Sequence, residues 1–262
     1  MTPVAPQTIE NRTDERMSES RRERRIALVT GATRGIGLEI ARQLGRQGFV
    51  TLVGARDRTR GEAAVSRLTA EDVDAEPVPL DVTSEASIAS AATTVAARFG
   101  RLDVLINNAG ILLDRGMNPS EVPPALLHAT YETNVFGPVA VIQAFLPLLR
   151  RSAAGRIVNV SSELASLARN TDPTFEFAHL KRLAYNSSKT ALNAVTVMFA
   201  HELRDTPIKV NAADPGYTAT DFNGFAGTQT VEEGARAAVA LALLPDDGPT
   251  GGYFNAEGPL PW

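Results

Sequence analysis

The chain has 262 residues, of which 44% are hydrophobic and 21% charged, and its formal net charge is −4. This balance is ordinary for a globular protein with a sizeable core, and it offers no basic surface for nucleic acid or for an anionic membrane. The sequence has no cysteine, which excludes disulfides, thiolate metal sites and cysteine nucleophiles, and its three histidines lack metal-ligand spacing. We therefore expect a cytoplasmic protein with no metal, no nucleic-acid partner and no membrane partner.

Residues 1–25 differ from the rest of the chain in composition. They are polar and Arg-rich, with almost no apolar periodicity, which predicts a flexible leader ahead of one domain at 26–262. The segment lacks the apolar stretch of a secretory signal, and its acidic residues disfavour an organellar transit peptide. We expect the run Arg21–Arg25 to be a solvated arm.

From residue 26 onward, short apolar runs alternate with helical patterns. The runs predict strands at 26–30, 49–54, 77–80, 102–106, 156–160, 208–212 and 252–255. Apolar periodicity predicts helices at 35–47, 84–98, 121–133, 135–150, 185–204 and 231–243. Continuous apolar strands alternating with helices are typical of a parallel sheet covered on both faces. The expected fold is a single-domain, doubly wound α/β sheet of Rossmann type with about seven strands and helices on both faces.

A glycine-rich loop joins the first strand to the first helix. Small residues there let the backbone approach a pyrophosphate closely, and the helix N-terminus offers free N–H groups and a positive dipole end. This junction makes the pattern stronger than a lone glycine motif. The loop residues expected at a dinucleotide are Gly31, Thr33, Arg34, Gly35, Ile36 and Gly37.

The end of the second strand distinguishes the two nicotinamide nucleotides. A ribose 2′-hydroxyl is usually met by an acid here, whereas a 2′-phosphate is met by arginine. Ala55 stands where the acid is expected, Arg56 follows it, and Arg34 in the glycine loop can reach the same phosphate. Asp57 lies one step later, where it faces solvent or caps the next helix. We therefore expect NADP(H) rather than NADH.

Other strand ends carry further candidates, since ligands of open α/β sheets bind at the carboxyl ends of the strands. Asp81 is suited to accept from an adenine amino group beside the Val82 backbone. Asn107 can brace neighbouring loops, and the pair Ala109–Gly110 lets the backbone approach the cofactor. Each of these taken alone is also compatible with a structural turn.

The candidate chemistry combines two serines at a strand end with a tyrosine and a lysine on one helix face. Ser161 and Ser162 end a buried strand, and Tyr185 and Lys189 are spaced i, i+4. A nearby ammonium and a positive nicotinamide would lower the tyrosine pKa from about 10 and make the phenol a general acid. A serine hydroxyl can donate to the developing alkoxide of a carbonyl substrate, and Asn134 can anchor a water that resupplies the proton.

These motifs together resemble the short-chain dehydrogenase/reductase family over about residues 25 to 262. The matching segments are TGATRGIG (30–37), LDV (80–82), NNAG (107–110), Asn134, NVSS (159–162), YNSSK (185–189) and DPGYTATD (214–221). The resemblance implies Asn134, Ser162, Tyr185 and Lys189 as catalytic residues, with Ser161 as the alternative serine. It also implies cofactor contacts from Asn108, Ala109, Gly110, Tyr185, Lys189, Pro215, Gly216, Thr218 and Thr220. The tail 248–262 resembles carbonyl-reductase-like members, which reduce ketones or aldehydes with NADPH.

The 163–184 segment is longer than in compact members of the family. Its middle predicts a short helix capped by Asp172 or Thr174, and it is either a wall of the substrate cleft or a surface elaboration. The loop 221–233 reads as a mobile lid in which Phe222 and Phe225 contact an apolar substrate or pack within the loop. Monomer, homodimer and homotetramer all stay open.

The leading hypothesis is an NADPH-dependent oxidoreductase that reversibly reduces a small-molecule carbonyl to an alcohol, with Tyr185 as general acid/base. The alternative is a non-catalytic protein that senses NADP(H), which would have no use for a proton donor. An epimerase or dehydratase is disfavoured, since such enzymes resemble longer chains with a different glycine spacing.

Overall fold

The computed structural model of the protein describes residues 24–262, so the predicted leader lies outside the described residues except for its last two arginines. Arg24 donates to the carbonyls of Gly48 and Phe49 and pairs with Asp74 at 2.9 Å. The Arg25 guanidinium lies 4.5 Å from the centre of the Phe49 ring. These two residues therefore pack at the amino end of the sheet, and the expected solvated arm does not extend to them.

The centre of the fold is one seven-stranded sheet with the order β3-β2-β1-β4-β5-β6-β7, in which every neighbouring pair is parallel. The predicted doubly wound sheet is confirmed. The strands are β1 (Ile26–Thr30), β2 (Val50–Ala55), β3 (Ala75–Pro79), β4 (Val104–Asn107), β5 (Arg156–Val160), β6 (Lys209–Ala213) and β7 (Tyr253–Phe254).

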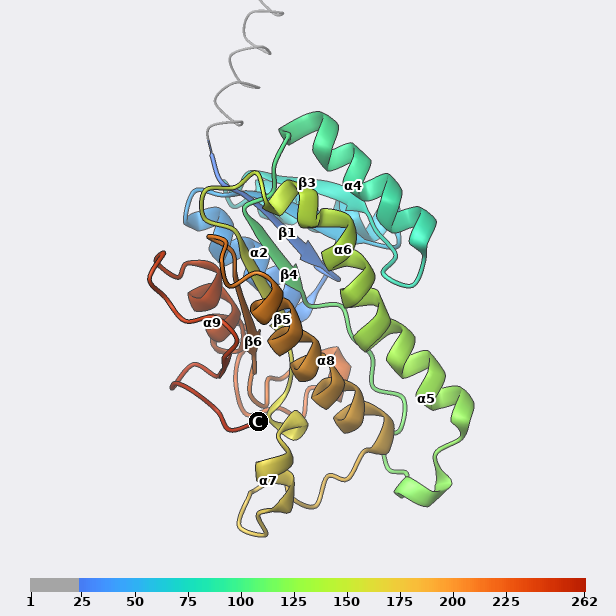
Figure 1. The fold of residues 1–262 in the computed structure, drawn as a ribbon. Coiled ribbons are helices and arrows are strands. Elements are labelled where there is room, and N and C mark those ends of the chain that lie inside the picture. Colours follow the sequence, from blue (N-terminus) through green and yellow to red (C-terminus); the bar gives the residue numbers. More distant parts are fainter. Residues whose placement is uncertain (1–23) are drawn as a thin grey trace, which may run out of the picture.

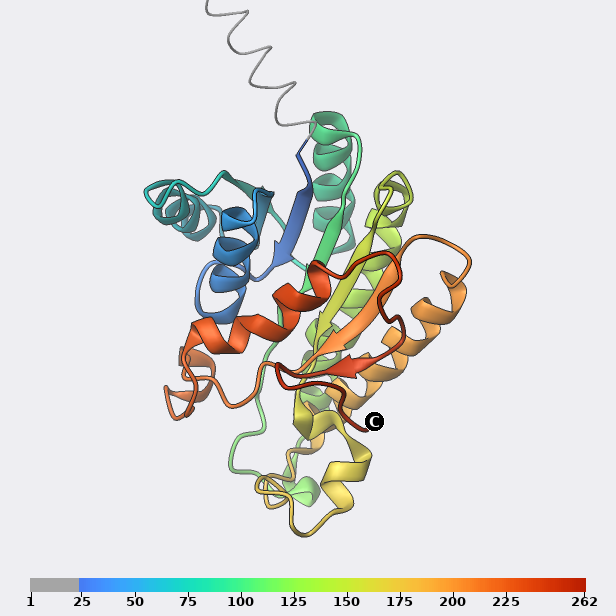
Figure 2. The same cartoon turned by 90° about the vertical axis from the view of Figure 1, so that its left-hand side faces the viewer.

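Helices cover both faces of this sheet (Figures 1 and 2). One face carries α2 (Gly35–Arg46), α3 (Arg58–Thr69) and α9 (Val231–Ala242). The other face carries α4 (Glu85–Phe99), α6 (Gly137–Leu149) and α8 (Leu183–Glu202). The short helix α7 (Leu167–Thr171) hangs below the carboxyl end of the sheet, and α5 (Pro124–Tyr131) precedes α6 (Figure 1).

Successive residues of each strand enter opposite cores, as side-chain alternation along a strand requires. In β1, Ala27 and Val29 pack on the side of α2 and α9, whereas Ile26 and Leu28 pack on the side of α4 and α6. Both sets are buried, so the strand is apolar without interruption. This explains why the sequence shows continuous runs rather than alternating ones.

The region around Asn134 differs from the predicted break between two helices. Residues Glu132–Phe136 form a π-helical segment, η2, that joins α5 to α6 without interruption. The resulting stretch Pro124–Leu149 is long and apolar enough to cross a membrane by composition, with a mean hydropathy of 1.3. Its buried side chains, including Val141, Ile142 and Phe145, pack against the sheet, so we interpret it as a core helix.

Two further segments depart from the sequence expectations. Helix α3 is not predicted from apolar periodicity, because the only residues that it buries are Gly61, Ala64 and Leu68. The short helix expected from Asp172 onward lies earlier, where the Ser166 hydroxyl accepts from the N–H of Arg169 at the start of α7. Asp172 instead accepts from the backbone and hydroxyl of Thr174 in a turn, which competes with helix formation.

Candidate functional site

A cleft of about 370 Å³ opens at the carboxyl edge of the sheet, between β1 and β4, where the order of the strands in the sheet reverses. Open α/β sheets bind ligands at this switch point. Most of the residues expected at the cofactor line it: Gly31, Thr33, Arg34, Gly35, Ile36, Gly37, Arg56, Asp81, Val82, Asn108, Ala109, Gly110, Tyr185, Lys189, Pro215 and Thr220.

The glycine loop is shaped by contacts that a larger residue would break. Gly31 has a φ of +64°, and a Cβ there would lie 3.0 Å from the Cα of Ala109. Asn108 fastens the two loops together, since its side-chain amide donates to the carbonyls of Thr30 and Gly31. Helix α2 begins without a side-chain cap, so its first N–H groups face the cleft available for an anion.

Arginines surround the nucleotide end of the cleft. Arg56 is exposed, and Arg60, which the sequence reasoning missed, also lines the cleft. Asp57 is occupied elsewhere, because its carboxylate accepts from the N–H of Arg60 and caps α3. Arg34 pairs across the cleft mouth with Asp221 at 2.8 Å. Arg60 Nε also lies 3.6 Å from Asp57 Oδ2. Arg56 is therefore the cleft arginine best placed to meet a 2′-substituent.

Asp81 is held in a fixed orientation beside this end of the cleft. Its Oδ1 accepts from the backbone N–H of Thr83 at 3.0 Å and from the Thr83 hydroxyl at 2.7 Å. These hydrogen bonds keep the pKa of the Asp81 carboxyl below its usual value. Asp81 is therefore an ionised acceptor at neutral pH, as recognition of an adenine amino group requires.

Asn134 is fully buried on the π-helical segment and links two elements. Its Oδ1 accepts from the N–H of Ile111 at 2.8 Å, and its Nδ2 donates to the Ile111 carbonyl and to the Ser188 hydroxyl. The π-helical turn directs the side chain toward α8, and such turns are frequent at functional sites. Asn134 thus ties the segment after β4 to the helix that carries Tyr185.

Tyr185 lines the cleft, and the Ser162 hydroxyl beside it lines the adjoining cavity. The Tyr185 ring packs on Phe222 with 5.8 Å between ring centres. Burial raises the pKa of Tyr185 to about 12, against the influence of the Ser162 hydroxyl and the Arg182 charge. Of the neighbouring charges, Asp214 raises this pKa and Arg182 lowers it, and the lowering expected from Lys189 together with a positive nicotinamide stays a prediction.

Lys189 lies one helical turn after Tyr185 and is also buried. Its Nζ donates to the Val160 carbonyl at 2.7 Å, and a Cβ on Gly110 would lie 3.5 Å from that nitrogen. Burial lowers the pKa of Lys189 to about 8. The ammonium is therefore held at the floor of the cleft, at the strand end from which the two serines follow.

The two serines have different partners. The Ser161 hydroxyl donates to Asn193 Oδ1 at 2.6 Å inside the protein. The Ser162 hydroxyl accepts from the N–H of Leu164 at 3.3 Å and faces Tyr185. Ser161 lines the cleft but its hydroxyl is taken by Asn193, whereas Ser162 lines the adjoining cavity beside the phenol, in agreement with the family pattern.

A second cavity of about 220 Å³, which Ser162 lines, adjoins the cleft at Pro215. The 163–184 segment contributes Phe177 and Leu180 to its wall. Phe177 packs on Tyr217, with 5.5 Å between ring centres, which joins this segment to the loop after β6. Part of the segment therefore forms a cavity wall and is more than a surface elaboration.

Some predicted residues lie outside the cleft. Gly216 lines the second cavity instead, and the Thr218 hydroxyl donates to the Pro215 carbonyl at 2.9 Å. Phe222 lines the cleft, whereas Phe225 is 70% exposed and does not. Arg115 donates to the carbonyls of Phe222 and Asn223, so the start of the expected lid is fastened from across the cleft.

Three buried polar residues near Tyr185 were not among the site residues expected from the sequence, although Asp214 and Tyr253 lie in segments that match the family. Asp114 accepts from the N–H of Ala184 at 2.7 Å, at the start of the helix that carries Tyr185. Asp214 and Tyr253 bond to the turn that carries Ser162. Each comes from a different element, so only the three-dimensional structure brings them to the site.

Comparisons with known proteins agree with this geometry. A sequence model of the family described as short chain dehydrogenase matches residues 25–230. Short-chain dehydrogenase anuI of Penicillium roqueforti is 40% identical over 83% of this chain and 88% of its own length. The (+)-neomenthol dehydrogenase of Arabidopsis thaliana is 35% identical over 89% and 96%, respectively. The NADPH-bound carbonyl reductase from chicken fatty liver is 29% identical, with a TM-score of 0.79 over 91% of this chain and 99% of its own. The chain thus belongs to the short-chain dehydrogenase family, in agreement with its sheet order, its glycine loop and its Ser162–Tyr185–Lys189 site.

Proposed function

We propose that the protein is an NADP(H)-dependent oxidoreductase that reduces a ketone or aldehyde to an alcohol, and that it also runs the reverse reaction. The observation that carries the proposal is the Ser162 hydroxyl beside the Tyr185 phenol, where a cleft with a glycine-lined phosphate end meets the adjoining cavity. The glycine loop of that cleft fits the pyrophosphate of a dinucleotide, because the loop is folded tightly upon itself. A Cβ on Gly37 would lie 2.7 Å from the Gly31 carbonyl oxygen and would displace the loop.

When bound, the reduced nicotinamide supplies the hydride that a carbonyl carbon accepts. The residues of the protein supply the proton and the orientation. The Tyr185 hydroxyl gives its proton to the carbonyl oxygen and becomes a phenolate, while the Ser162 hydroxyl donates a hydrogen bond to the same oxygen. Lys189 would hold a ribose hydroxyl of the cofactor, and Asn134 keeps α8 at a fixed distance from the segment after β4.

The pKa of Tyr185 fits the reducing direction. A phenol with a pKa of about 12 stays protonated throughout the neutral range, so it is ready to donate. Oxidation of an alcohol needs the phenolate, so its rate should rise as the pH is raised. The names of several relatives support the assignment, among them the NADPH-bound carbonyl reductase and the neomenthol dehydrogenase.

Substitution of Tyr185 by Phe tests the proposal directly. The change removes the proton donor and leaves the ring in place, so we expect kcat to fall by roughly 10²- to 10⁴-fold while the Kd for NADPH changes less than about twofold. Loss of NADPH absorbance with a panel of aldehydes, aryl ketones, diketones and steroid ketones measures the rate.

The matched control is Tyr131→Phe, which removes a hydroxyl from α5 outside the cleft and should leave kcat unchanged. A Tyr185→Phe variant with the rate of the unaltered protein would refute the mechanism. Tight NADPH binding with no turnover on any carbonyl would instead favour the non-catalytic sensor.

A further inference from the structure

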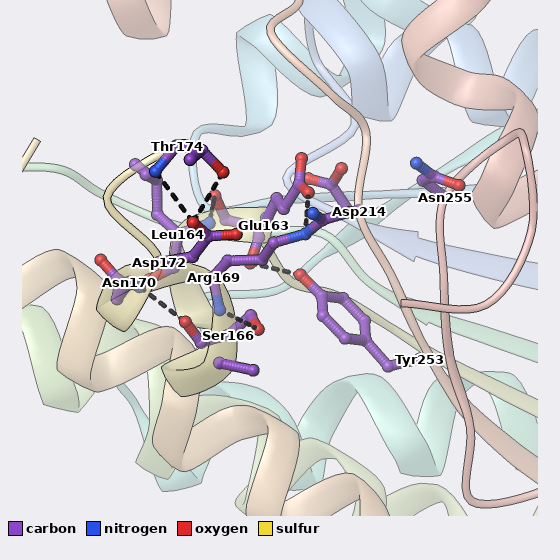
Figure 3. Close-up of polar contacts among 12 residues, drawn as sticks. Glu163, Leu164, Ser166, Arg169, Asn170, Asp172, Thr174, Asp214, Tyr253 and Asn255 are labelled. Atoms are coloured by element: carbon purple, nitrogen blue, oxygen red, sulfur yellow. Dashed lines mark hydrogen bonds and ion pairs between the residues drawn. The ribbon is translucent and has the colours of Figure 1, made fainter. Parts of the chain in front are cut away.

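The peptide between Ser162 and Glu163 is held at both of its polar groups. Its carbonyl oxygen accepts from the Tyr253 hydroxyl at 2.5 Å and from the N–H of Ala165 at 2.7 Å. Its N–H donates to Asp214 Oδ1 at 2.9 Å. Figure 3 shows the Tyr253 hydroxyl and the Asp214 carboxylate directed at the turn that carries Glu163. One peptide unit is thus fixed by two side chains.

Two different segments supply these side chains. Asp214 follows β6, and Tyr253 lies in the neighbouring strand β7. The N–H of Asp214 donates to the Phe254 carbonyl at 2.8 Å, so the two segments are joined to each other beside the peptide. The holders therefore form one rigid support at the edge of the sheet rather than two independent contacts.

The support continues along the turn through Trp262. Its ring stacks on Tyr253, with 5.4 Å between centres and 19° between planes. Its carbonyl accepts from the N–H of Ala168 at 3.1 Å and from the Ser166 hydroxyl at 3.2 Å. The segment that follows the catalytic serine is thus braced at successive points from the same side.

Both side chains are buried, so keeping the Tyr253 hydroxyl and the Asp214 carboxyl there costs the fold stability. Tyr253 is 2% exposed and Asp214 is 4% exposed. Burial raises the pKa of Asp214 to about 6, against the hydrogen bonds that it accepts from the backbone of Glu163 and Gly216, and burial also raises the pKa of Tyr253. A phenylalanine would fill the Tyr253 site and stack on Trp262 without a phenol to satisfy, so packing alone does not require the hydroxyl.

We propose that Tyr253 and Asp214 are positioning residues that fix the Ser162–Glu163 peptide and so hold the Ser162 hydroxyl against Tyr185. This inference rests on the proposed function, in which Ser162 donates to the substrate oxygen. A shift of that peptide also shifts the Cα of Ser162 and so carries its hydroxyl away from the phenol. Displacements of about 1 Å at a reacting group can lower a rate by roughly 10²-fold.

A double-mutant cycle with Tyr253→Phe and Ser162→Ala tests the proposal. If Tyr253 acts through Ser162, its hydroxyl matters only while Ser162 has one. We expect Tyr253→Phe to lower kcat for carbonyl reduction roughly 10-fold in the otherwise unaltered protein and less than about twofold in the Ser162→Ala background. The Kd for NADPH and the thermal midpoint of Tyr253→Phe should stay close to the original values, and Tyr131→Phe is the control for loss of a hydroxyl elsewhere.

A second arm uses Asp214→Asn, in case Tyr253→Phe folds poorly. The amide nitrogen cannot accept a hydrogen bond, so one uncharged oxygen must serve the N–H groups of both Glu163 and Gly216, and it holds them less tightly than the carboxylate. We expect the same dependence on Ser162. Equal fold losses in both backgrounds, or no loss in the otherwise unaltered protein, would overturn the proposal while leaving the proposed function intact. A Ser162→Ala variant of full activity would contradict the proposed role of Ser162 and overturn the inference with it.

Discussion

At the scale of single residues, the choice of nucleotide depends on Arg56 and Arg34. Arg56 lines the cleft and is free to meet a phosphate, whereas Arg34 is shared with Asp221 at 2.8 Å. Arginine meets a phosphate with a two-pronged, charge-assisted contact that a ribose hydroxyl cannot match. We therefore expect Arg56→Ala to weaken NADPH binding by roughly 10-fold or more and to leave NADH binding unchanged, as measured by fluorescence titration of each nucleotide.

The neighbouring Arg58 provides a matched control for that loss of charge. It pairs with Glu62 along α3 and does not line the cleft, so Arg58→Ala should leave both affinities unchanged. Tighter binding of NADH than of NADPH, with no response to Arg56→Ala, would contradict the cofactor assignment.

At the scale of elements, the start of α8 depends on a residue from another segment. Arg182 at its N-cap makes no side-chain capping bond, and the buried Asp114 carboxylate accepts from the N–H of Ala184 instead. A carboxylate at a helix N-terminus also meets the positive end of the helix dipole. Because Tyr185 directly follows Ala184, this contact fixes the first turn of the helix that carries the proton donor.

We expect Asp114→Ala to lower the free energy of unfolding by about 1–3 kcal/mol, since a buried N–H loses its partner. Urea denaturation measures this change, and kcat should fall several-fold with it. Asp114→Asn, which keeps an acceptor for the N–H of Ala184, should retain most of the stability and most of the kcat of the unaltered protein. Ser152→Ala removes a hydroxyl that donates to the buried Asp103 carboxylate at 2.6 Å, at the amino end of the sheet away from the cleft, and should cost stability without changing kcat. If Asp114→Ala lost stability but kept its full kcat, the cap would have no part in placing Tyr185.

Elements with a strong local signal were the ones that the sequence could predict. Continuous apolar runs located the strands, and the glycine loop and the Tyr185–Lys189 spacing located much of the cleft. Each of these signals is carried by residues that lie only a few positions apart in the sequence. Helix α3 was missed because it buries only a narrow stripe. Asp114 and Tyr253 could not be predicted, since their partners lie 70 and 91 residues away in the chain.

At the scale of the whole molecule, strongly shifted ionisable groups gather in one corner of the described residues. The pKa values of Tyr185, Asp214 and Tyr253 are raised and that of Lys189 is lowered, in each case chiefly by burial. Such clusters mark functional sites, because a fold selected for stability alone would place apolar groups there. The cleft is therefore also where pH couples to the stability of the entire protein.

Lys189 makes this coupling measurable through the cofactor. With a pKa of about 8, its ammonium form is present below pH 8 and is lost as the pH rises above that value. A ribose hydroxyl that accepts from Lys189 favours the ammonium, so binding raises this pKa and takes up a proton above pH 8. The Kd for NADPH should then rise with pH above 8, by at most about tenfold per pH unit.

The rise in thermal midpoint that a fixed NADPH concentration produces should accordingly shrink between pH 7 and pH 9.5. Calorimetry in buffers of different ionisation enthalpy should show proton uptake on binding near pH 9. Lys189→Met keeps the length of the side chain without its charge, so this variant should bind NADPH more weakly and without that pH dependence. An unchanged pH dependence in Lys189→Met would assign the proton to another group and separate Lys189 from the cofactor.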